Sequence, residues 1–266
     1  MDKRIVKGYV NFTLKRVIKQ KSIYIIFLYI LIFPYLAIKS NVFSREDNFW
    51  NGVFYLLGSR YIYGIFFLTI FLLLIYNVCN DGNITPFVHT RLDNKINWLI
   101  SKYILIFVTS IIYLIFIIFS VYIGVYLNLG YSPNWSSSAI NGDDLYTLFA
   151  KNLTPLSSII IYYIRFHLSL IVLGMLEMSL AIGFTSVNYG LSLAISIIIV
   201  FISTVVLNLR NIPVINLLDI GNIYIFSFNS NYNLMEFIVA NNFHLLIMIV
   251  AIHILLKYNL KEIVLK

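Results

Sequence analysis

One apolar stretch of the chain, residues 158–184, carries three side chains of the kind that move protons or bind charged ligands: Arg165, His167 and Glu177. Ionisable groups inside a membrane segment are costly, and they usually face a bundle interior or a wet cavity. Arg165 and Glu177 are twelve residues apart, about 18 Å along a helix that rises about 1.5 Å per residue, so they cannot pair. We expect Arg165 and His167 near the outer interface, where a long basic side chain reaches water. Glu177 is expected deeper, facing a wet path or a partner helix.

The other reactive residues form no recognisable catalytic or metal site. Cys79 is the only cysteine, and His244 and His253 lie nine residues apart, where we expect them to face different directions. The chain has no Gly-Lys dipeptide, hence no Walker A loop, and neither G-x-S-x-G nor H-E-x-x-H. We therefore expect no cofactor, no metal and no nucleotide site. An intramembrane enzyme is the less favoured alternative, because no two reactive groups share one depth.

The composition indicates what kind of scaffold must position these groups. Of the 266 residues, 60% are hydrophobic and 11% are charged, whereas a soluble domain has about 25% charged residues. The mean hydropathy is +0.88. These values exclude a soluble globular protein and favour a polytopic membrane protein. We assign the net charge of +8 to the cytoplasmic edges of the membrane segments and expect no nucleic-acid partner.

Six apolar runs are long enough to be membrane spans, since one crossing needs about 20 residues. The runs are continuous rather than alternating, which favours helices over a β-barrel. The expected fold is thus an all-α polytopic membrane protein with six transmembrane helices. A secretory signal peptide is an alternative for the first run only, disfavoured by its long basic leader. The predicted spans cover about 22–38, 52–78, 103–127, 158–184, 190–209 and 237–256.

The distribution of Lys and Arg predicts the orientation in the cell membrane. Most of them fall in three segments, 1–21, 80–102 and the tail after 256, and positive residues near span ends stay on the cytoplasmic side. Both termini are therefore expected to be cytoplasmic, which requires an even number of spans. The opposite side has only Lys39, Arg45, Arg60, Lys151 and Arg210.

Residues 1–21 are too charged to cross a membrane but have an amphipathic pattern. Val6, Tyr9, Val10 and Val17 share one side of a helical wheel. We expect an interfacial helix with this side at the lipid headgroup boundary; a disordered basic tail is the alternative.

The segment 80–102 also predicts an amphipathic helix on the cytoplasmic side. Thr85-Pro86 suits a helix start, and Arg91 and Lys95 lie one turn apart beside an apolar stripe. Trp98, suited to the interface, and Lys102 follow. An ordinary surface helix lying on the membrane is the alternative. The stripe consists of Val88, Leu92, Ile96 and Ile100.

Two further segments are expected on the outer side. Residues 128–156 are polar, with three consecutive serines at 136–138, and are predicted to be an ordinary exposed loop. Residues 210–242 alternate short apolar pieces, such as 234–240, with Asn, Asp and Gly. This pattern is typical of half-buried or re-entrant segments.

The run Thr90-Arg91-Leu92-Asp93-Asn94-Lys95-Ile96-Asn97-Trp98-Leu99-Ile100-Ser101-Lys102 resembles the segment between spans two and three of type 2 ATP-binding-cassette (ABC) exporter permeases. The resemblance implies that the helix from Pro86 to about Lys95 is a coupling helix docking on a separate ATPase subunit. Thr90, Arg91, Lys95 and Trp98 would then be coupling residues. The N-terminal helix is similar to the family's elbow helix, and 210–242 to its outer re-entrant hairpin. The sequence departs from the family at Leu92-Asp93-Asn94, where a more basic or glycine-containing run is common.

The resemblance implies a permease subunit that dimerises, with itself or a sister subunit, around a path for an amphipathic peptide or lipid-like cargo. Its size is similar to permeases of bacterial peptide export and lantibiotic self-protection systems. Energy would come from the ATPase subunit. The alternative is a membrane scaffold or immunity-type protein that binds a peptide or partner without driven transport.

Overall fold

The computed structural model describes residues 3–41, 43, 47–59, 61–79, 95–141, 147–183, 189–205 and 234–262, and every regular element among them is a helix. Three of these helical segments are long and apolar enough to cross a membrane: Lys21–Ser40, Ile96–Leu129 and Pro155–Gly183. They contain the predicted spans 22–38 and 103–127 and all but the last residue of 158–184. The described part of the chain is therefore all-helical, with helices of the membrane-spanning type.

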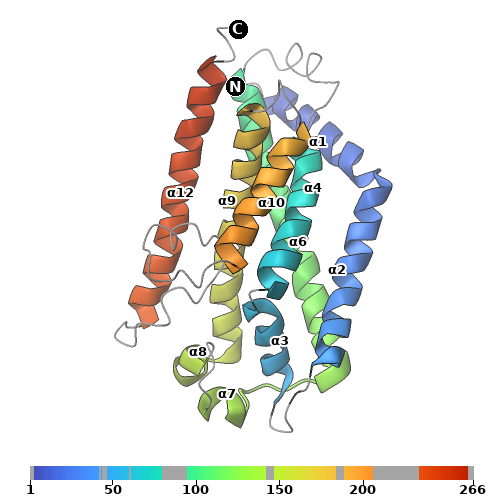
Figure 1. The fold of residues 1–266 in the computed structure, drawn as a ribbon, viewed down its shortest axis with the longest axis vertical. Coiled ribbons are helices and arrows are strands. Elements are labelled where there is room, and N and C mark those ends of the chain that lie inside the picture. The colour runs from blue at the N-terminus through green and yellow to red at the C-terminus, as the bar shows by residue number, and fades with distance from the viewer. Residues whose placement is uncertain are drawn as a thin grey trace.

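The helices form one elongated bundle (Figure 1). In chain order they are α1 (Lys3–Ile18), α2 (Lys21–Ser40), α3 (Phe49–Gly58), the π-helix η1 (Tyr61–Leu68), α4 (Thr69–Cys79), α6 (Lys95–Leu129), α7 (Ser137–Asn141), α8 (Thr147–Asn152), α9 (Pro155–Gly183), α10 (Tyr189–Val205) and α12 (Leu234–Glu262).

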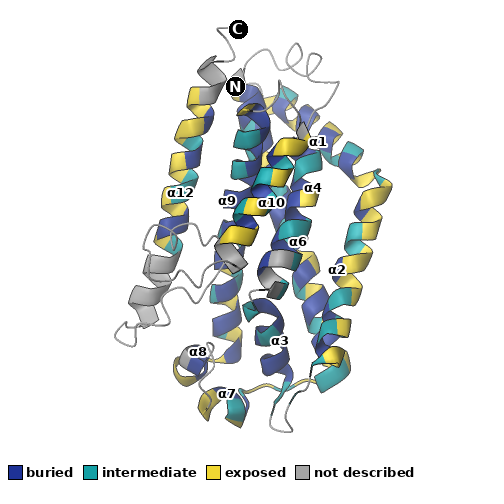
Figure 2. Cartoon of the chain, in the orientation of Figure 1, coloured by how far each residue is buried: buried dark blue, intermediate teal, exposed yellow. Residues whose placement is uncertain are grey.

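The long helices α6 and α9 form the centre of the bundle. α6 packs against α2, α1, α3 and α4, while α9 packs against α6, α4, α10 and α12. The helix α1 and the last turns of α12 lie at one end, here called the α1 end, and α7 and α8 lie at the other, the α7 end (Figure 1). The outward faces of α2 and α12 carry most of their exposed residues (Figure 2), and many of these are large and apolar, as a lipid-facing surface requires.

The contact between α2 and α6 compensates for a proline inside a helix. Pro34 has no N–H, so the carbonyl of Ile30, one turn earlier, has no partner within α2. The hydroxyl of Ser120 in α6 donates a hydrogen bond to that carbonyl. Gly124, one turn further along α6, lies so close to α2 that a Cβ there would be 2.8 Å from the Tyr35 nitrogen. The small residue at 124 thus permits the approach that lets Ser120 reach Ile30.

The predicted span 52–78 is not one uninterrupted helix. α3 ends at Gly58, and a second helical segment begins at Tyr61 as the π-helix η1 and continues as α4. α3 also begins earlier than predicted, because Asn48 caps it: the Asn48 side chain accepts from the Trp50 nitrogen at 3.0 Å, and Asn51 accepts from the Asn48 nitrogen at 3.2 Å. This capping arrangement satisfies amide groups that a helix start would leave unpaired.

The prediction that 128–156 is an ordinary exposed loop is wrong. Its described part contains α7 and α8, with Ser136 and Ala139 buried. The Ser136 hydroxyl donates to the Asn51 side chain at 2.6 Å, and the Ser138 hydroxyl donates to Asp47 at 2.7 Å. Hydrogen bonds to the start of α3 therefore hold this segment as an ordered cap on the α7 end. Residues 142–146 lie outside the described part.

The last helix is longer than predicted. α12 begins at Leu234, so the apolar piece 234–240, which we expected in a re-entrant segment, forms its first turns. Asn241 and Asn242 continue the same helix. The rest of the proposed re-entrant segment, 210–233, lies outside the described residues. The predicted fifth span, 190–209, corresponds to α10 up to Val205.

Candidate functional site

A buried lysine connects three helices at the α1 end. Lys102, near the start of α6, is fully buried, and its Nζ donates hydrogen bonds to the carbonyl oxygens of Val78 at 2.9 Å and Cys79 at 3.0 Å. These carbonyls are the last of α4, where no further helical N–H is available to them. The C-terminus of a helix also carries partial negative charge, which favours a cation. Lys102 therefore caps α4.

Aromatic rings enclose the same ammonium group. Lys102 Nζ lies 5.5 Å from the ring centre of Tyr9 in α1 and 5.7 Å from that of Trp98, one turn earlier in α6. Cations at this distance are attracted by the negative faces of aromatic rings. We call this group of Tyr9, Val78, Cys79, Trp98 and Lys102 the lysine junction. It joins α1, α4 and α6 where the segment 80–94 leaves α4 and enters α6.

The position of α1 differs from the expected one. The predicted apolar side is correct, since Val6, Tyr9, Val10 and Val17 are all buried. However, this side packs on the ends of α6 and α4 rather than facing the lipid headgroups. Arg16 adds a hydrogen bond from its guanidinium to the Asn77 carbonyl at 3.2 Å. The exposed side of α1 carries four basic residues, Lys3, Arg4, Lys7 and Lys15.

The structure addresses the predicted coupling residues only in part. Thr90 and Arg91 lie outside the described residues, as does most of the proposed coupling helix. Lys95 is the first residue of α6. Trp98 is buried, with 7% of its surface exposed, and packs in the lysine junction. Its role as a coupling residue stays a prediction.

Glu177 faces a neighbouring helix of its own chain. Its carboxylate is fully buried and accepts hydrogen bonds from the hydroxyls of Ser192 at 2.7 Å and Ser196 at 2.5 Å. Both serines belong to α10 and are four residues apart, so they lie on one face of it. Of the two environments expected for Glu177, this is a partner helix. The four-residue spacing of Ser192 and Ser196 is the feature of the sequence from which this contact could have been predicted.

Arg165 is more enclosed than the expected side chain that reaches water. Arg165 is 2% exposed, so its side chain does not reach the outer interface. The membrane depths expected for Arg165 and Glu177 stay predictions. The His167 ring packs on the edge of Phe107, with ring centres 5.3 Å apart.

The three polar groups of α9 are therefore separate structural features and not one catalytic constellation. The histidines of α12 are also separate: His253 pairs with the Tyr103 hydroxyl of α6 at 2.6 Å, and His244 is buried nine residues earlier. Within the described part of the chain, no three metal-ligating side chains come together.

No protein-family model, curated protein or solved structure matches the chain. A functional conclusion therefore depends on the residues and their geometry.

Proposed function

We propose that the chain is the permease subunit of an ABC exporter. It crosses the cell membrane six times, through α2, the α3–α4 segment, α6, α9, α10 and α12, with both termini cytoplasmic. It dimerises with itself or with a sister subunit, and it moves an amphipathic peptide or a lipid-like substrate. Nucleotide is hydrolysed by a separate ATPase subunit that docks on the helix from Pro86 to about Lys95.

The lysine junction is the observation on which this proposal mainly depends. It fixes both attachment points of the segment 80–94, because Lys102 Nζ lies within 3.0 Å of the last carbonyls of α4. A partner that moves this segment would therefore move α4 and α6 together. Tyr9 extends the same connection to α1. Such an arrangement suits a segment that transmits a movement from a docked subunit into the membrane helices.

The distribution of charge supports the proposed cargo. In the helices long enough to cross the bilayer, few side chains are charged, and the carboxylate of Glu177 is occupied by two serines of α10. Few charges remain to coordinate a small ion, which favours an apolar or amphipathic cargo.

Purification of the full chain from its native membrane in mild detergent, with identification of co-eluting proteins and an ATPase assay, tests this proposal. We expect a stoichiometric ATPase subunit that is lost from the Arg91→Glu/Lys95→Glu variant. The matched control is Lys3→Glu/Lys7→Glu, which makes the same charge change at the same four-residue spacing on exposed positions of α1. The control should retain the subunit.

Two results would contradict the proposal. If both variants lose the ATPase equally, the interaction depends on general basic charge and not on the coupling helix. If the unmodified chain elutes alone and without ATPase activity, the scaffold or immunity-type alternative replaces transport.

A further inference from the structure

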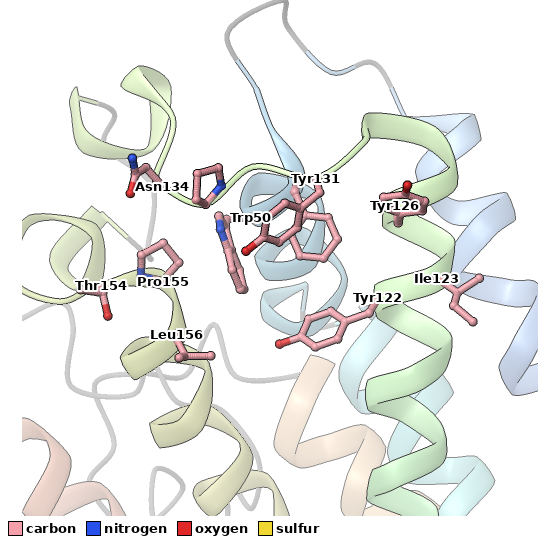
Figure 3. Close-up of a pocket in the computed structure, with 11 residues that line it drawn as sticks. Trp50, Tyr122, Ile123, Tyr126, Tyr131, Asn134, Thr154, Pro155 and Leu156 are labelled. Atoms are coloured by element: carbon pink, nitrogen blue, oxygen red, sulfur yellow. The ribbon is translucent and has the colours of Figure 1, made fainter.

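A cavity of about 640 Å³ lies at the α7 end, between the start of α3, the end of α6 and the start of α9. Figure 3 shows its walls: Trp50 at the back, Tyr122 and Tyr126 from α6, Tyr131 from the following turn and Leu156 from α9. Its volume is in the range of small-molecule sites, about 300–1,000 Å³. We propose that this cavity binds one acyl chain of a phospholipid in the outer leaflet.

The walls are fixed by hydrogen bonds before any ligand arrives. The indole nitrogen of Trp50 donates to the Ser132 carbonyl at 2.8 Å, and the Asn48 side chain donates to the Asn134 carbonyl at 2.8 Å. Gly130 adopts a φ of 68°, which turns the chain sharply after α6. The turn 131–134 is thereby held against the start of α3. Because the cavity is already formed, its side chains and turns lose little conformational entropy when a ligand binds.

The chemistry of the lining favours an uncharged hydrocarbon chain. None of the eleven residues that line the cavity is charged. Most are aromatic or aliphatic, so they suit a methylene chain, which packs against them through van der Waals contacts. The polar side chains of Asn134 and Thr154 both lie on the left side of the view, away from Tyr126 (Figure 3). They suit the neutral ester region of a phospholipid rather than its phosphate.

The cavity is continuous with the lipid-facing surface, which identifies a lipid as the occupant. Ile123 and Leu156 line it and are also exposed on the outside of α6 and α9. Phe119 and Ile160, about one turn away on the same helices, are exposed as well. Tyr126 and Tyr131 lie near the end of α6, and tyrosines are typical of the membrane interface. An acyl chain can therefore enter sideways from the membrane. This inference requires a membrane location and, for the choice of the outer leaflet, the proposed orientation; it does not depend on the transport proposal.

Quenching of tryptophan fluorescence by brominated lipid tests the inference. The chain has three tryptophans, so Trp98→Phe/Trp135→Phe leaves Trp50 as the only emitter. The variant is reconstituted in phosphatidylcholine vesicles with either brominated or ordinary acyl chains. We expect quenching at least about twofold stronger for Trp50 than for Trp98 in the matched Trp50→Phe/Trp135→Phe variant, because quenching requires near contact with the ring. Trp50 and Trp98 are similarly buried, at 5% and 7% exposed.

Filling the cavity mouth provides the control for specificity. In the Trp50-only protein, Leu156→Phe with Ile123→Phe should reduce the quenching to the value measured for Trp98. The control is Ile164→Phe, which should leave the quenching unchanged because Ile164 is an exposed residue of α9 that does not line the cavity. Leu156→Phe alone serves if the double variant does not fold. Equal quenching of Trp50 and Trp98, or no effect of the filled mouth, would overturn the inference. So would quenching that is absent while an added amphipathic peptide shifts the Trp50 emission, because the cavity would then accept a peptide.

Discussion

The hydroxyl of Ser120 replaces a backbone donor that Pro34 removes, and this can be tested with a double-mutant cycle. Ile30 and Ser120 are both buried, so water cannot satisfy the Ile30 carbonyl if the hydroxyl is lost. An unsatisfied buried carbonyl costs about 1–3 kcal/mol, and hydrogen bonds between membrane helices average about 0.6 kcal/mol with a maximum near 1.7. We therefore expect Ser120→Ala to lower the free energy of unfolding by about 1–1.5 kcal/mol.

The cost should fall when a backbone donor is restored. In Pro34→Ala the new N–H of residue 34 can donate to the Ile30 carbonyl, as in a regular helix. In that background Ser120→Ala removes only a second hydrogen bond, and we expect a cost below about 0.5 kcal/mol. The expected coupling free energy between the two positions is thus about 1 kcal/mol. Unfolding by SDS titration in mixed micelles, followed by far-UV circular dichroism, measures all four proteins.

Ser110 provides the matched control on the same helix. Its hydroxyl donates to the Phe107 carbonyl within α6 at 2.8 Å, and that carbonyl already accepts a helical N–H. Ser110→Ala should cost the same with Pro34 and with Ala at that position. If Ser120→Ala also costs the same in both backgrounds, the hydroxyl does not substitute for the missing N–H and the explanation is refuted.

Three further changes have defined outcomes in the same unfolding assay. Gly124→Ala should destabilise by about 1–3 kcal/mol, because its Cβ would lie 2.8 Å from the Tyr35 nitrogen, whereas Gly183→Ala, with open space around it, should be nearly neutral; equal effects would contradict the close approach of α2 and α6. Lys102→Met should destabilise by about 1–3 kcal/mol, because the last carbonyls of α4 lose a charged donor; an unchanged protein would show that the lysine junction does not hold α4. Ser192→Ala/Ser196→Ala should cost more than Glu177→Gln, because it leaves a carboxylate without donors, about 1–3 kcal/mol for each lost partner; the reverse order would refute the pairing of α9 with α10.

Local patterns predict much of the helical framework. The long apolar runs predict α2, α6 and α9, because a segment in hydrocarbon must satisfy its own backbone and be apolar on most sides. The periodicity of the first 21 residues likewise predicts the buried side of α1. Periodicity does not say what covers that side, so the sequence could not distinguish the headgroup region from the ends of α4 and α6.

Contacts between distant residues account for what the sequence did not predict. A polar residue such as Ser136 is compatible with a solvated loop and with an ordered cap. The partner that makes it part of a cap, Asn51, is 85 residues away in the sequence. Lys102 counts as one more positive charge near a membrane edge, and only the fold shows that it caps α4 from 24 residues away. Thr90, Arg91 and the coupling helix remain predictions, because they lie outside the described residues.

The length of α6 has a consequence for the bilayer around the protein. Its 35 residues extend about 52 Å, whereas the hydrocarbon core is about 30 Å thick. α2, with 20 residues, extends about 30 Å and matches that thickness without tilt. The two helices are joined where Ser120 and Gly124 meet Ile30 and Tyr35, so they cannot adapt to membrane thickness independently. A thinner bilayer that tilts α2 must also tilt α6, and with it the lysine junction at one end and the aromatic cavity at the other. The chain length of the surrounding lipids therefore affects both ends of the molecule, because α6 connects them.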